Sequence, residues 1–258
     1  MMKVLAIEFR KLLRLSSIKF TGIILVLFPI LWAYAPGVFK QYQVFLVSAY
    51  QVPALSLSSG ITYLLPLLVA IACAELLGLE MTYHTLPTIL LRPVTRSQWL
   101  TAKVIVAVVY PFILLAILLI ISLIAGAPLG YGSFVGGTGL GPDGLLGSGT
   151  MSPGAAIGEL LRAYFLAGCT LVPIGLLSIL LTIVFMNTAA GTLGTVSTLI
   201  LMYLMGFLPK GIYDFFLSNL IANAYRSTEI SYVVFIALGL YCAVFAAVAV
   251  VLFERKDF

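Results

Sequence analysis

One long polar stretch, residues 75 to 103, gathers ionisable side chains between two long apolar runs. The stretch holds Glu75, Glu80, His84, Arg92, Arg96 and Lys103. The chemistry open to such a set is metal binding, proton transfer or ion pairing. Glu80 and His84 are four residues apart, on one face of a helix, but a metal site needs three or more protein ligands. We therefore predict a docking surface for a cytoplasmic partner, with no metal and no catalytic residue.

Enzymatic chemistry has little support elsewhere in the sequence. A serine or cysteine nucleophile needs a base, and the single histidine lies in this polar stretch. No H-E-x-x-H sequence occurs, and Cys73, Cys169 and Cys242 lie in apolar runs as small buried hydrophobes. No glycine is followed by lysine, so a P-loop is absent and ATP-driven work requires another subunit.

The composition is that of a polytopic membrane protein. Hydrophobic residues make up 62% of the chain and charged residues 9%, with a mean hydropathy of +1.17. The net charge of +5 comes from basic residues beside apolar runs, which is typical of orientation signals and lipid phosphate contacts. Nucleic acid is therefore not an expected partner.

The apolar runs predict an all-α membrane protein with six transmembrane helices in a single domain over residues 1–258. The break between the fourth and fifth runs is only Met186 to Thr188, so a single kinked hairpin is the alternative there. The predicted spans are 17–35, 55–77, 102–126, 160–186, 189–208 and 231–253.

Residues 1–16 predict an interfacial amphipathic helix. At 100° per residue Lys3, Arg10 and Arg14 fall within about 40° of one another, opposite the apolar residues. Glu8 alone interrupts the apolar arc. The helix is either a simple surface anchor, or Glu8 faces a partner or the next cytoplasmic loop.

Lysine and arginine placement predicts that both termini and the loop 78–101 are cytoplasmic. Segment 127–158 has neither residue and is rich in glycine, so we expect a mobile extracellular loop. Its Gly139-x-Gly141-x-x-Gly144 pattern has no strand before it and no helix after it, which argues against a nucleotide site. Residues 209–230 are expected to form an extracellular re-entrant or surface-lying segment.

Small residues four apart in the fifth run predict close helix packing. They serve contacts within the chain or across a dimer, and the sequence leaves both open. The residues are Gly191 with Thr195 and Gly194 with Thr198.

No predicted span carries an ionisable residue near its middle, and Glu75 falls by the inner end of its span. Proton- and ion-coupled carriers usually hold such residues in the membrane. A secondary carrier or an intramembrane enzyme is therefore the alternative function and not the preferred one.

The polar stretch resembles the first cytoplasmic loop of ABC-2 type transporter permeases. The likeness rests on Glu80, His84-Thr85-Leu86, Arg92-Pro93-Val94-Thr95-Arg96 and Lys103, with His84 where glycine is usual and Thr95 where serine is usual. The N-terminal Glu8-Phe9-Arg10-Lys11 and the tail Phe253 to Asp257 are similar to that family too.

This resemblance implies a permease subunit of an ABC exporter that moves an apolar or amphipathic substrate, such as a drug, peptide or lipid, across a bacterial or archaeal plasma membrane. It implies a dimer, with itself or with a similar permease. It also implies a separate cytoplasmic ATPase that binds ATP and Mg, so this chain needs no cofactor. The ATPase-coupling residues would be Glu80, His84, Thr85, Leu86, Leu90, Arg92 and Arg96, with lipid phosphate as the alternative contact for the two arginines.

Overall fold

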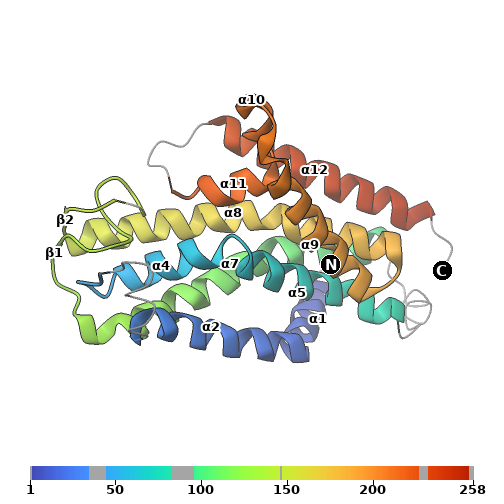
Figure 1. Cartoon of the computed structure of the whole chain (residues 1–258). Helices are drawn as coiled ribbons and strands as arrows, with labels where there is room; N and C mark the ends of the chain where they lie inside the picture. The colour runs from blue at the N-terminus through green and yellow to red at the C-terminus, as the bar shows by residue number, and fades with distance from the viewer. Residues whose placement is uncertain (1, 35–44, 83–95, 146, 227–231, 256–258) are drawn as a thin grey trace.

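The protein is described here by a computed structural model of residues 2–34, 45–82, 96–145, 147–226 and 232–255 (Figure 1). Almost all of this part of the chain is helical. The helices are α1 (Met2–Arg14), α2 (Ser16–Tyr34), α4 (Gln51–Gly60), α5 (Leu64–Thr82), α7 (Arg96–Gly126), α8 (Pro153–Phe185), α9 (Thr188–Leu204), α10 (Lys210–Tyr213), α11 (Leu217–Asn223) and α12 (Tyr232–Arg255), with short 3-10 turns η1 (Ala127–Leu129) and η2 (Met205–Phe207) and strands β1 (Phe134–Val135) and β2 (Thr150–Met151).

Six of the described helices are long and apolar enough to cross a membrane, which confirms the all-α class and the six spans by length and composition. They are α2, α5, α7, α8, α9 and α12. With η2 counted as part of the α9 span, the shortest spans have 19 residues and reach about 28 Å at 1.5 Å per residue, close to the hydrocarbon thickness of a bilayer.

The second predicted span differs from the structure. Residues 55–77 do not form one helix: α4 ends at Gly60 and α5 begins at Leu64. Pro66 lies in the first turn of α5, where its missing N–H costs nothing. Because α5 continues to Thr82, Glu75 lies deeper inside a helix than the sequence indicated.

The fourth and fifth spans are separate helices, not one kinked hairpin. Met186 takes a left-handed conformation, with φ of 53°, and ends α8. The Asn187 side chain then starts α9 by accepting hydrogen bonds from the N–H groups of Ala189 and Ala190, at 2.8 and 3.2 Å.

Helix α8 is the centre of the bundle and has the largest buried share of the six spans. It packs against α5, α7, α9 and α12. Gly175 permits the close approach of α5 and α7 to α8, because a Cβ atom at this position would lie 2.9 Å from the Cys73 sulfur and 3.3 Å from the Ala107 carbonyl oxygen. By contrast α2, α9 and α12 expose apolar faces that lipid or another subunit must cover.

The glycine-rich segment is a folded cap instead of the expected mobile loop. Strands β1 and β2 pair, and Phe134, Leu140 and Leu145 are buried. Buried Gln51 donates from Nε2 to the Gly136 carbonyl oxygen at 3.0 Å. The glycines supply tight turns with positive φ, and at Gly137 a Cβ atom would collide with Gln51.

Segment 209–230 contains two short helices, α10 and α11, in its described part. Helix α11 packs on α8 and α9 and buries Leu217, Leu220 and Ile221, followed by buried Tyr225. This explains why the segment is too apolar for a free loop.

Candidate coupling face

One end of the bundle gathers α1, the end of α5, the start of α7, the turn between α8 and α9, and the end of α12 (Figure 1). Strands β1 and β2 lie at the opposite end (Figure 1). Trp99 of α7 stacks on Phe253 of α12 with ring centroids 5.2 Å apart. Gly78 of α5 touches Thr188 of α9, where a Cβ atom on Gly78 would lie 2.9 Å from the Thr188 Cα. These contacts join α7 to α12 and α5 to α9 at this end.

Four charged side chains from three helices form a closed ring at this end, which we call the charge quartet: Glu8 and Lys11 of α1, Glu80 of α5 and Lys103 of α7. Lys103 Nζ lies 2.8 Å from Glu8 Oε2 and 3.2 Å from Glu80 Oε2. Lys11 Nζ lies 3.0 Å from Glu8 Oε1 and 2.6 Å from Glu80 Oε1. Each carboxylate contacts both ammonium groups. Because the ring holds two negative and two positive charges, its net charge is zero.

Lys11 is the exposed member of the quartet, and Glu8 and Lys103 are buried. Lys103 has 0% of its side chain exposed and Glu8 has 2%, whereas Lys11 has 44%. Lys103 also donates to the Leu76 carbonyl oxygen and lies 4.6 Å from the centre of the Trp99 ring. A buried ammonium group needs this full set of partners, because each lost partner leaves a charge in a medium of low polarity.

Helical spacing positions the quartet. Glu8 and Lys11 are three residues apart and share a face of α1. Trp99 and Lys103 are four apart on α7, so the aromatic ring lies directly beneath the ammonium group.

The positive charge of Lys11, the exposed member of the quartet, is stabilised by Glu80 and Glu8. Partial burial alone would lower the pKa of Lys11, but the hydrogen bond and charge of Glu80, with those of Glu8, raise it above its ordinary value of 10.5. Lys11 is therefore fully cationic at neutral pH.

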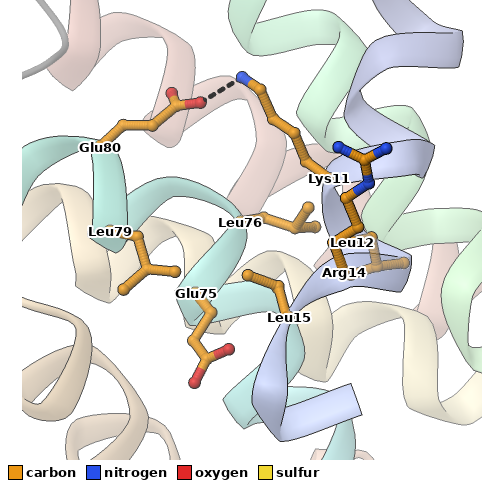
Figure 2. Close-up of a pocket in the computed structure, with 8 residues that line it drawn as sticks. All are labelled: Lys11, Leu12, Arg14, Leu15, Glu75, Leu76, Leu79 and Glu80. Atoms are coloured by element: carbon orange, nitrogen blue, oxygen red, sulfur yellow. Dashed lines mark hydrogen bonds and ion pairs between the residues drawn. The ribbon is translucent and has the colours of Figure 1, made fainter. Parts of the chain in front are cut away.

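A groove of about 370 Å³ runs between α1 and α5 beside the quartet (Figure 2). Leu12, Leu15, Leu76 and Leu79 line it, with the Lys11–Glu80 pair at one end. Figure 2 shows the Glu75 carboxylate turned away from that pair.

A second hollow, of about 610 Å³, lies between α5 and the start of α9. Ile71, Glu75, Leu79 and Thr82 come from α5, and residues 187–189, 192 and 193 from the turn and α9. Glu75 and Leu79 thus form a ridge between the two hollows.

A family model described as ABC-2 family transporter protein matches residues 4–204. The chain belongs to the ABC-2 transporter family. It is a multi-pass membrane permease domain, a transport subunit without a catalytic domain. The matched residues include the charge quartet and the lining of both hollows. A search of curated proteins found no match to the chain.

The structure places the predicted interfacial residues of this permease on different sides of α1. Arg10 and Arg14 are exposed, whereas Glu8 is buried. Glu8 faces Lys103, which follows the predicted coupling loop in sequence, and not a free surface.

Most of the predicted coupling residues of the permease lie outside the described part of the chain: His84, Thr85, Leu86, Leu90 and Arg92. Arg96 is the first residue of α7, and its side chain is likewise outside the description. Glu80 is mostly buried in the quartet, with 12% of its side chain exposed.

The small residues of α9 pack within the permease chain. A Cβ atom on Gly191 would lie 2.9 Å from the Thr182 Cα, and one on Gly194 would meet Phe185 and Leu181, all of α8. Thr195 and Thr198 donate to carbonyl oxygens of their own helix, each at 2.8 Å. Contacts with α8 therefore account for both glycines.

Sequence reasoning missed the ion pairs of Lys11 and Lys103. The available signal was Glu8, the one charge in the apolar arc of α1, because a carboxylate on a buried face requires a cationic partner. Which of the many basic residues supplied it depends on tertiary structure.

Proposed function

We propose that this permease is the membrane subunit of an ATP-driven exporter and that a separate ABC ATPase binds at the end that carries the charge quartet. Members of the family typically pair with an ATPase. The substrate we propose is apolar or amphipathic, because both hollows combine a mainly apolar surface with a few charged or polar side chains.

The observation that carries this proposal is the charge quartet. The loop between α5 and α7 departs from Thr82 and returns at Arg96, and the quartet ties both flanking helices to α1. A load on that loop would therefore move α5, α7 and α1 together. Binding of an ATPase can bias transport only through contacts that differ between two states, and linked helices extend such contacts into the membrane.

A second copy of the chain, or a similar permease, completes the transport path in this proposal. The exposed apolar faces of α2, α9 and α12 offer the area for it. Lipid covers whatever the second copy leaves exposed.

The test is purification of the tagged permease from its native membranes in a mild detergent. We expect a second protein with a P-loop to purify with it and to hydrolyse ATP in a vanadate-sensitive manner. The permease alone should not hydrolyse ATP. Transport in proteoliposomes driven by a proton gradient without ATP would instead support the alternative, a secondary carrier.

The variants Leu86→Asp and Leu90→Asp test whether the loop between α5 and α7 binds the ATPase. A charge at a desolvated protein interface costs a few kcal/mol, which is roughly a hundredfold in affinity. Both variants should release the ATPase or uncouple it while inserting normally, and Val135→Asp on exposed β1, at the opposite end of the bundle, serves as the control. Full assembly and coupling in both loop variants would place the ATPase elsewhere.

A further inference from the structure

Glu75 differs from the two carboxylates of the charge quartet. It lies seven residues before the end of α5, about 10 Å along the helix axis. Its carboxylate accepts a hydrogen bond from the hydroxyl of Ser17 at the start of α2. Within the described ranges, no lysine or arginine forms an ion pair with it, whereas Glu8 and Glu80 each contact two lysines.

A carboxylate at this depth in a membrane span is costly without a cation. Ionisable residues inside such spans face a cavity or pair with another charge, and they mark ligand paths. The Ser17 hydroxyl and the N-terminus of α2 offset part of the cost through one hydrogen bond and the helix dipole. Two carboxylate oxygens accept more than one hydrogen bond, so capacity remains for a ligand.

Of the two hollows that Glu75 lines, the one between α5 and α9 suits a cation better. The α1–α5 groove has Lys11 and Arg14 on its rim, which repel a cation. Among the described residues that line the α5–α9 hollow none is basic, and Ile71, Leu79 and Leu193 give it apolar walls. Its volume of about 610 Å³ is in the range of sites for drug-sized molecules.

Two of the three threonine hydroxyl groups that line this hollow already donate hydrogen bonds, and the third, Thr188 Oγ1, is uncharged and buried without a hydrogen-bond partner among the described residues. Thr82 donates to the Gly78 carbonyl oxygen at 2.8 Å, and Thr192 donates to that of Thr188 at 3.0 Å. The Asn187 side chain caps α9. Glu75 is therefore the group in this lining with a charge to offer an incoming molecule.

We propose that Glu75 is the recognition carboxylate for an amphipathic cation, whose ammonium or phosphonium group meets Glu75 while its apolar body fills the α5–α9 hollow. This inference rests on the proposed export function, because it names the substrate class. The ridge position lets the ligand enter from the lipid side without crossing the charge quartet.

The experiment measures binding of a lipophilic cation, tetraphenylphosphonium, to the full-length permease in nanodiscs by equilibrium dialysis. The shape-matched anion tetraphenylborate is the control ligand. We expect saturable binding of the cation alone. Glu75→Gln keeps the hydrogen bond with Ser17 but removes the charge, and it should weaken cation binding about ten- to a hundredfold.

Three matched variants separate charge from structure and locate the ligand. Ser17→Ala removes the hydrogen bond but keeps the carboxylate, so it should retain cation binding. Glu75→Asp keeps the charge and should bind within about threefold of the original chain. Leu193→Trp narrows the α5–α9 hollow and should weaken binding, and unchanged binding in this variant would overturn the assignment to that hollow.

Equal binding of the cation by the original chain and by Glu75→Gln overturns the proposal, as does equal saturable binding of the anion. If Glu75→Gln does not fold, displacement decides: dodecyltrimethylammonium should displace the bound cation and the anion should not. These measurements need no ATPase. Failure of cation binding with an intact ATPase complex would reject only this inference, and loss of the complex alone would reject the export proposal.

Discussion

At the scale of single residues, the charge quartet depends on neutrality as much as on contact. Two carboxylates and two ammonium groups cancel, and the most buried pair, Glu8 with Lys103, has almost no exposure to water. The sequence signalled that Glu8 was unusual, because it stood alone among apolar neighbours. It did not identify Lys103, 95 residues away, because only the packing of α1 on α7 brings the two together.

Lys103→Met should therefore destabilise the permease by about 3–5 kcal/mol, since it leaves an uncompensated buried carboxylate. Glu8→Met combined with Lys103→Met restores neutrality and should recover most of the loss. Reversible unfolding in mixed micelles measures both. A double variant as unstable as Lys103→Met would show that packing, not charge balance, determines the effect.

Lys11 gives a pH prediction. Because the folded state raises its pKa above 10.5, its stabilising contribution is fully present below that value and is lost as the pH rises through the raised pKa. The difference in melting temperature between the original chain and Lys11→Met should thus stay constant from about pH 6 to about pH 9. A difference that disappears within this window would contradict the ion pairs of Lys11.

At the scale of elements, apolar run length was enough to find the six spans, because only helices satisfy their backbone groups in lipid. Their ends were less predictable. Helix α7 begins at Arg96, six residues before the predicted start at 102, since arginine and glutamine are polar yet favour helices. The break between α4 and α5 falls between Gly60 and Pro66, residues that favour a helix end and a first turn, but both stand inside one apolar run, so run length alone did not reveal it.

The close approach of α5 and α9 at Gly78 is testable. Gly78→Ala places a Cβ atom 2.9 Å from the Thr188 Cα, so the helices must separate, at a cost of about 1–3 kcal/mol. Gly22→Ala in α2 is the matched control, because nothing lies within 4 Å of its added methyl group. It should be neutral or slightly stabilising. Thermal melting in nanodiscs compares the two, and equal melting temperatures would refute the contact.

At the scale of the whole molecule, α1 and the end of α12 belong to the end of the bundle that carries the charge quartet, and the glycine-rich cap lies at the other (Figure 1). The basic residues beside the quartet favour the cytoplasm for that end. Composition predicted this separation, but it suggested a mobile loop where the cap is folded, because glycine content alone does not distinguish a flexible chain from one with many tight turns.

The orientation predicts a labelling pattern. In intact cells a membrane-impermeant maleimide should modify Ser148→Cys in the cap and spare Ser16→Cys at the start of α2. Permeabilised cells should show both sites modified, which controls for accessibility. The reverse pattern in intact cells would place the quartet outside and remove the basis for ATPase docking there.

The separation of Glu8 from Lys103 along the chain also bears on how the protein is made. The ribosome synthesises α1, α2, α4 and α5 before it reaches Lys103. Until Lys103 has been added and α7 has folded, Glu8 and Lys11 of α1 lack one member of the quartet. The N-terminal helix can settle only after α7 has entered the bilayer. The quartet that joins α1 to α5 and α7 is therefore completed only after α7 has been synthesised.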